Sequence, residues 1–378
     1  MDKFDTIRPF YDTEVNGAIK GALHHPMMKA LMSFTFPDTP EEVWMEQLTK
    51  THSKRDFQVN FIYQAVQKVL EKSSDGLTSS GFEKLEKHTP YLFISNHRDI
   101  ILDTSLLNVC LYDNGLIMTA SAIGDNLVQK AFLHTLSRLN RNFLVQRGLP
   151  PRELLQSSKL MSEYIYQLLS RENRSVWIAQ REGRTKDGND ATQQGVLKML
   201  AMASDEPNLM DYFKKIRIVP VSISYEYDPT DALKLPRLIA EANDEVYVKE
   251  KNEDFMTLLS GIMGQKKRIH IQVCDVLDSE LESIKAEQDN QNKQIQMLAQ
   301  VIDDAILSTY KLWPTNYIAH DLLNNTDTYS SHYTEKEKHV FERRLEMRID
   351  AGNELARNSF LSLYANPVVN KMKYQNAV

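Results

Sequence analysis

The chemically most suggestive feature of this sequence is a histidine followed closely by carboxylates. The stretch Tyr91–Leu107, YLFISNHRDIILDTSLL, places His97 directly after an apolar run, with Asp99 and Asp103 shortly behind it. A carboxylate can hold an imidazole in one tautomer, and such an imidazole can take a proton from a hydroxyl group and make it a nucleophile. On this motif alone, an ordinary strand–helix corner with a surface histidine is an equally good interpretation.

Short elements on both sides of His97 are predicted to hold it in place. The run Tyr91–Ile94 is long enough for a short buried strand, and Ser95 and Asn96 end it. The apolar residues between Ile100 and Leu107 predict a helix that starts just after the histidine. A histidine at the end of a strand can then meet a carboxylate in the first turn of the next helix.

A charged loop follows another candidate strand, Ser175–Ala179. The sequence continues QREGRTKDG and brings Glu182, Gly183, Arg184 and Lys186 within a few residues. Glycine permits a tight turn in which backbone N–H groups face an anion. A solvated charged turn is the ordinary interpretation of such a run. However, ligands of open α/β sheets bind at the carboxyl ends of strands, so the position of this loop favours an anion site.

Two further runs have the character of buried strands. NRNFLVQR has Arg141 and Arg147 near its ends, and a guanidinium can donate two parallel hydrogen bonds to a phosphate. Each arginine could equally pair with a surface glutamate. The second run, Ile216–Tyr225, is apolar and β-branched, and Pro220 within it predicts a strand edge or an irregularity.

These four stretches, in this order, resemble the sequence blocks of the glycerolipid acyltransferases, the family of glycerol-3-phosphate and 1-acylglycerol-3-phosphate acyltransferases. Members carry Asn-His, four further residues and an Asp, whereas here five residues separate His97 from Asp103. Asp99 therefore stays an alternative. We prefer Asp103 because the small and then apolar residues after it resemble the helix that follows the family's aspartate.

The charged loop resembles the third block of the same family, in which Glu-Gly precedes Thr-Arg. Glu182 and Gly183 match directly, Arg184 precedes Thr185 in reversed order, and Gln180-Arg181 replaces the usual Phe-Pro. The resemblance implies a catalytic pair of His97 with Asp103, or with Asp99. The substrate-binding residues that it implies are Arg147, Arg141, Glu182, Gly183, Arg184, Lys186 and Pro220.

The implied reaction belongs to phospholipid biosynthesis. His97 would take the proton of a glycerol-type hydroxyl, which attacks an acyl thioester directly, and the arginines would hold the phosphate of the acceptor. Acyl-CoA or acyl-carrier protein would be the co-substrate, with no bound cofactor and no metal. Two alternatives stay open: an O-acyltransferase acting on another lipid, such as an aminoacyl lipid, and a non-catalytic lipid-binding protein with a degenerate site.

Composition sets the surroundings of this chemistry. The chain has 378 residues, 42% hydrophobic and 25% charged, and a net charge of −6, so attraction of an anion must come from a local cluster of cations. Its two cysteines, Cys110 and Cys274, fit a reducing compartment and support no cysteine-based metal site. The sequence lacks a signal peptide and an apolar run of about 18 residues. We therefore expect a cytoplasmic protein, or one that is peripheral on the inner face of the membrane.

The expected architecture is α/β: a mixed, largely parallel sheet flanked by helices, with an N-terminal helical bundle and C-terminal helices. We assign residues 1–85 to a helical N-terminal domain and residues 86–378 to the acyltransferase domain with its C-terminal helices. Gly115–Ala120 predicts a further strand, Ser121 opens the next helix, and a last helix is expected over Thr334–Leu363. The Met- and Phe-rich patch Met27–Phe36 is predicted to be core, with a membrane-docking surface as the alternative.

Overall fold

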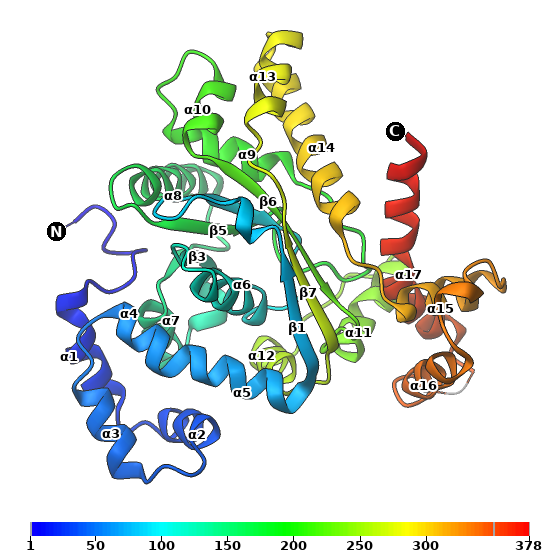
Figure 1. The fold of residues 1–378 in the computed structure, drawn as a ribbon, viewed down its shortest axis with the longest axis horizontal. Coiled ribbons are helices and arrows are strands. Elements are labelled where there is room, and N and C mark those ends of the chain that lie inside the picture. Colours follow the sequence, from blue (N-terminus) through cyan, green and yellow to red (C-terminus); the bar gives the residue numbers. More distant parts are fainter. Residues whose placement is uncertain (1, 351, 378) are drawn as a thin grey trace.

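The computed structural model describes residues 2–350 and 352–377, and these residues form one seven-stranded sheet with helices on both faces (Figure 1). The strand order is β1-β7-β6-β2-β5-β3-β4, and all neighbouring strands are parallel except the β6–β7 pair. This confirms the α/β class and the mixed, largely parallel sheet. The strands are β1 (Ser74–Ser80), β2 (Leu92–Ser95), β3 (Thr119–Gly124), β4 (Asn142–Val145), β5 (Ser175–Ala179), β6 (Ile218–Tyr225) and β7 (Lys267–Val273).

Helices precede, connect and follow these strands. Those before the sheet are α1 (Asp12–Ala22), α2 (Pro26–Thr35), α3 (Glu41–Thr49), α4 (Lys54–Phe57), the π-helical turn η1 (Gln58–Ile62) and α5 (Tyr63–Ser73). The connecting helices are α6 (Leu102–Asp113), α7 (Ala131–Leu139), α8 (Pro151–Ser170), α9 (Gln194–Leu200), α10 (Leu209–Lys215), α11 (Asp231–Ala242) and α12 (Glu253–Met263). The C-terminal helices are α13 (Asp278–Glu287), α14 (Gln291–Thr309), α15 (Pro314–Asn324), α16 (Glu335–Glu346) and α17 (Glu354–Ala377).

The central strands are buried on both faces, which explains their continuous apolar sequence. In β2, Leu92 and Ile94 pack into the core shared with α8, α9, α10, α13 and α14. Phe93 points to the other face, where it packs with α5 and α6. In the neighbouring β5, Val176 and Trp177 divide between the same two cores. The buried strands therefore lie where the apolar runs predicted them.

The N-terminal helices differ from expectation at their end. Residues 74–80 form the strand β1, so the prediction that the region up to residue 85 is helical is wrong there. This segment, SDGLTSS, is polar and carries a single large apolar residue, and its pairing with β7 at the edge of the sheet left no signal in the local sequence. The Met- and Phe-rich patch confirms the core interpretation, because Met28 and Met32 are fully buried among the N-terminal helices.

The bounds of two elements and the position of Pro220 also differ from the sequence-based expectation. The third strand runs from Thr119 to Gly124, so Ser121 lies inside β3 and does not open a helix. The helix expected over Thr334–Leu363 is two helices, α16 and α17, with a break after Glu346. Pro220 lies in the middle of the sheet, opposite Ile94 of β2. It is tolerated because the β6–β7 pairing begins only at Val221.

Candidate active site

His97 lies two residues beyond the end of β2, at the carboxyl edge of the parallel strands. Its Nδ1 atom is 2.8 Å from the Oδ2 atom of Asp103, which is in the first turn of α6. The His97 side chain keeps 12% of its exposure, whereas that of Asp103 is fully buried. Trp177 of β5 meets the imidazole in an edge-on contact with ring centroids 5.3 Å apart. The imidazole is thus held on one side and reachable on the other.

The Asp103 carboxylate is fixed by several donors in addition to the histidine. The backbone N–H groups of Arg98 and Asp99 donate to its Oδ2 atom at 2.7 Å and 3.0 Å. The Tyr225 hydroxyl donates to the Oδ1 atom at 2.9 Å. Hydrogen bonds to a carboxylate favour its charged form. A charged Asp103 would favour the His97 tautomer that carries its proton on Nδ1 and leaves Nε2 open to a substrate.

Asp99 has a different role in the same turn. Its Oδ1 atom accepts the backbone N–H groups of Ile101 and Leu102, where α6 begins. Burial and the nearby charge of Asp103 raise the pKa of the Asp99 carboxyl. The extra residue between His97 and Asp103 is therefore accommodated in a turn that Asp99 closes, and the imidazole contact goes to Asp103.

Backbone and amide contacts hold the histidine loop against its neighbours. The Asn96 side chain bridges to β6, donating to the Ile223 carbonyl at 2.9 Å and accepting the Ile223 N–H at 2.8 Å. The Thr185 N–H donates to the His97 carbonyl at 3.0 Å. This last contact joins the histidine block to the Glu-Gly block, which lies far away in the sequence.

The charged loop after β5 contributes Arg184 and Lys186. Gly183 has φ 70°, so the tight turn expected there is present and uses the left-handed region that glycine favours. Arg184 donates to the Thr230 hydroxyl at 3.3 Å. Burial, together with the charges of Arg184 and Lys234, lowers the pKa of Lys186 to about 7. Burial and neighbouring cations thus disfavour the charged form of Lys186, and an anion bound beside it would stabilise that form.

Arg147 follows β4 at the same edge of the sheet. Its guanidinium forms an ion pair with Glu182 of the charged loop, and its backbone N–H donates to Asp125 at 3.1 Å. Both partners of the ion pair are partly exposed, at 34% and 69%. The structure therefore brings Arg147 to the Glu-Gly block, although with a carboxylate in place of a phosphate.

Two of the residues that the resemblance implied are not brought to His97. Arg141 lies just before β4, and parallel pairing of β4, β3, β5 and β2 puts that position at the opposite, amino edge of the sheet. Pro220 is buried mid-strand beside Ile94. Arg141 was misplaced because a short strand has an arginine at each end, and the sequence alone does not show which end faces the histidine.

Sequence reasoning also missed residues that shape this edge. Tyr225 ends β6 and reaches Asp103, and the buried Arg98 forms an ion pair with Asp190. Tyr225 was visible only as the last residue of an apolar run, and Arg98 only as the residue after the histidine. Their partners lie 122 and 92 residues away, respectively, and nothing in local spacing indicates such pairs.

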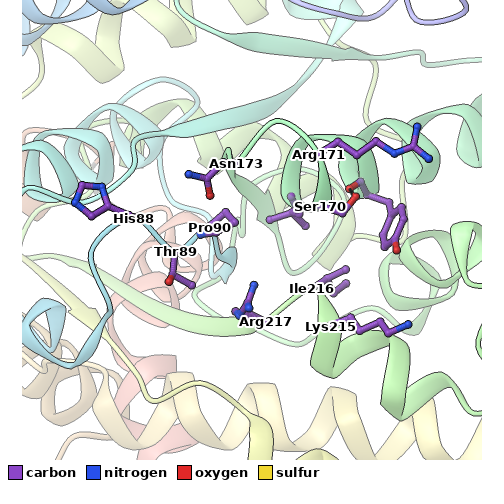
Figure 2. A pocket seen from close by; sticks show the side chains of 11 residues that line it. His88, Thr89, Pro90, Ser170, Arg171, Asn173, Lys215, Ile216 and Arg217 are labelled. Carbon is purple, nitrogen blue, oxygen red and sulfur yellow. Dashed lines mark hydrogen bonds between the residues drawn. The ribbon is translucent and has the colours of Figure 1, made fainter.

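One sizeable cavity lies away from His97. It has a volume of about 500 Å³ and opens near His88, Asn173 and Arg217, which precede β2, β5 and β6 at the amino edge (Figure 2). Among the described residues, no cluster of three or more His, Cys, Asp or Glu side chains is placed to hold a metal ion. In the part of the chain that the structure describes, every helix is too short or too polar to cross a membrane.

The chain is similar to known proteins at two levels, a family model and a solved structure. Residues 76–224 match the model of a family described as Acyltransferase, which confirms the family resemblance expected from the sequence. The match begins in β1, ends in β6, and includes His97 and the charged loop. Among solved structures, the chain is similar to the crystal structure of the 1-acyl-sn-glycerophosphate (LPA) acyltransferase PlsC from Thermotoga maritima. The two share 10% identity, the match covers 77% of this chain and 94% of that one, and the TM-score is 0.37. No curated protein matches the chain.

Proposed function

We propose that this protein transfers a fatty acyl group from an acyl thioester to a hydroxyl of a glycerol-phosphate-type lipid precursor. The proposal is supported by the match of residues 76–224 to an acyltransferase family model and by the geometry around His97. The observation that carries the proposal is the 2.8 Å contact between His97 Nδ1 and Asp103 Oδ2 at the carboxyl edge of the sheet. It favours a catalytic protein over a lipid-binding protein with a degenerate site.

The proposed chemistry uses the exposed side of the imidazole. Nε2 of His97 takes the proton of the acceptor hydroxyl as the oxygen attacks the thioester carbonyl carbon. The carbon–sulfur bond then breaks, and the proton passes from the imidazolium to the departing thiolate. Asp103 stabilises the imidazolium between these steps, and Tyr225 with the backbone N–H groups keeps that carboxylate in position.

Acceptor binding is assigned to the cations of the charged loop. Arg184 and Lys186 lie on the segment that Thr185 anchors to the His97 backbone, so an anion held there would be close to the base. Arg147 would join them if the acceptor phosphate displaced Glu182 from the ion pair. This supports glycerol 3-phosphate or 1-acylglycerol 3-phosphate as acceptor, and acyl-CoA or acyl-carrier protein as donor. No bound cofactor and no metal enter the proposed steps.

An acceptor screen tests the proposal. Purified protein is incubated with radiolabelled acyl-CoA or acyl-carrier protein and one acceptor at a time, and the lipid products are separated. We expect labelled product with glycerol 3-phosphate or its 1-acyl derivative, and none with glycerol or monoacylglycerol, which lack the phosphate. Product formed with an aminoacyl lipid alone would replace the acceptor assignment. Absence of product with every acceptor and both donors would contradict an acyltransferase.

We further propose a peripheral membrane contact through α12. Met256, Leu259 and Met263 lie on one side of this helix and are 53%, 40% and 59% exposed. Its inner side packs so closely on the histidine loop that a Cβ atom at Gly261 would lie 2.1 Å from the Asp99 carboxylate. The apolar surface therefore adjoins the site that would receive a lipid.

Vesicle flotation tests the membrane contact. The triple variant Met256→Ser, Leu259→Ser, Met263→Ser should lose association with phosphatidylcholine–phosphatidylglycerol vesicles. Val340→Ser on α16, which changes an apolar side chain of similar exposure (39%), should keep it. Equal flotation of the two variants would contradict a contact through α12.

A further inference from the structure

A second, smaller cavity lies at the amino edge of the sheet, at the opposite end of the strands from His97. Its volume is about 180 Å³, well above the ~10–15 Å³ that one water needs. It is lined by Arg141 and Arg174, which precede β4 and β5, by Tyr164 of α8, and by Phe10 and Lys54 of the N-terminal region. The cavity is therefore formed where the N-terminal helices meet the sheet.

Arg141 is the unusual residue of this cavity. It is only 7% exposed, and its buried Nε atom has no hydrogen-bond partner among the described residues. No ion pair joins it to any carboxylate in the part of the chain that the structure describes. A buried guanidinium without a partner costs free energy, and natural proteins rarely leave one in this state. Its position on the cavity wall indicates that the partner comes from outside the chain.

Two other cations of the cavity, Arg174 and Lys54, have their charges only partly compensated by neighbouring groups. Arg174 donates to the Met118 carbonyl at 3.2 Å and forms no ion pair within the described chain. Lys54 donates to the Phe10 carbonyl and lies 3.4 Å from Asp12. Burial, together with the Arg174 charge, lowers the pKa of Arg141 to about 10. Arg8 also lines the cavity but is paired with Asp5 and Glu14. The remaining cations, Lys54, Arg141 and Arg174, therefore outnumber the two carboxylates of the lining, Asp12 and Glu172.

We propose that this cavity binds the phosphate group of a small organic phosphate, with Arg141 and Arg174 as its principal donors. Two guanidinium groups suit the charge and the paired acceptor oxygens of a phosphate better than those of a single carboxylate. The walls contributed by Phe10, Tyr11 and Tyr164 provide apolar and aromatic surface for the organic part. Because residues from the N-terminal region and from the sheet both line the cavity, a bound phosphate would bridge the two.

Titration calorimetry with phenyl phosphate and with inorganic phosphate tests this site on the full chain. The double variant Arg184→Gln, Lys186→Gln removes the cations of the proposed acceptor site, so that any remaining binding is located elsewhere. In this background we expect saturable binding of phenyl phosphate, tighter than that of inorganic phosphate. Adding Arg174→Gln should weaken it by about tenfold or more, the effect of one charge-assisted hydrogen bond.

A matched control and a second variant complete the experiment. Arg171 precedes Arg174 by three residues and lines the larger cavity instead, so Arg171→Gln should leave binding of phenyl phosphate unchanged. Arg141→Gln should abolish binding of phenyl phosphate, and its circular dichroism spectrum shows whether the variant folds. If it does not fold, the Arg174→Gln variant decides the question, because Arg174 is less buried. Absence of binding in the Arg184→Gln, Lys186→Gln background, survival of binding in Arg174→Gln, or its loss in Arg171→Gln would each overturn the proposal. Equal affinity for the two probes would overturn the organic part of the ligand.

Discussion

The buried charged residues at the two edges of the sheet differ in whether they have ion-pair partners. At the carboxyl edge, the most deeply buried charges are paired: Asp103 receives several donors, Arg98 meets Asp190, and Lys234 meets Asp228. Among the described residues, Arg184 and Lys186 of the charged loop form no ion pair. At the amino edge, Arg141 is as deeply buried as Arg98 but has no carboxylate partner among the described residues. The buried Arg141 therefore supports the proposal that a ligand completes the amino edge, whereas the His97–Asp103 pair is held by contacts within the chain.

Removal of the His97 side chain is the strongest test of the catalytic role that we assign to the carboxyl edge. His97→Ala should lower acyl transfer by roughly two to four orders of magnitude, the contribution of a general base. The unfolding temperature should change little, because the imidazole has one polar contact and lies at the rim of the site. Initial rates and thermal unfolding of the same preparation measure both effects.

His88 provides the matched control at the amino edge. It is exposed and adopts φ 67°, so Asn, which tolerates that backbone conformation, is a suitable replacement. His88→Asn should retain wild-type turnover. If His97→Ala also retained it, the catalytic role of the carboxyl edge would be wrong.

The second prediction separates two carboxylates of one turn. Asp103→Asn should lower turnover by about a hundredfold or more, because an uncharged amide cannot stabilise the imidazolium. Asp99→Asn keeps an oxygen that can accept the Ile101 and Leu102 N–H groups and removes only a buried acid whose pKa is raised. Its turnover should fall by less than about tenfold. Steady-state rates at saturating acceptor give the comparison, and a more severe loss in Asp99→Asn would reverse the assignment.

The contrast between these carboxylates also shows what the sequence could predict. The strand before His97 and the helix after it follow from local patterns, because buried strands and helix starts have characteristic residues. The preference for Asp103 over Asp99 came from the family resemblance, and the imidazole contact goes to Asp103. The polar strand β1 has no such pattern and is held only by its pairing with β7, some 190 residues away. The sequence therefore indicated the centre of the sheet and missed its edge.

The site residues divide in the same way. Gly183 and Glu182 were predicted from a motif, and their loop lies where the motif implied. Arg141 and Arg147 look equivalent in the sequence. However, Arg141 precedes β4 and Arg147 follows it, so only Arg147 lies at the same edge of the sheet as His97. Which end of a strand faces the site depends on the direction of the neighbouring strands, and local spacing contains no information about it.

The third prediction concerns the arginines of the carboxyl edge. Arg184→Ala and Arg147→Ala should each raise the KM for the acceptor by about 1.5–3 kcal/mol in free-energy terms, the value of a charge-assisted hydrogen bond. Acceptor titrations at fixed donor concentration measure the effect, and the KM for the acyl donor should stay constant in both variants. Should the donor KM rise instead, the arginines would bind the donor, and the phosphate-acceptor assignment would have to be withdrawn.

The smallest predicted effect is a pH dependence due to Lys186. Burial lowers the pKa of this lysine to about 7, so it is charged below that pH and progressively neutral above it. The attraction for an anionic acceptor is therefore full at low pH, and the acceptor KM should rise by about three- to tenfold as the pH increases from 6 to 8.5. An acceptor phosphate also titrates near pH 6, so the profile of wild-type protein alone does not identify the group. Lys186→Arg separates them, because a guanidinium stays charged throughout. The acceptor KM of this variant should stay near its low-pH value, while the pH dependence of turnover persists. An identical rise in KM in Lys186→Arg would show that Lys186 does not bind the acceptor.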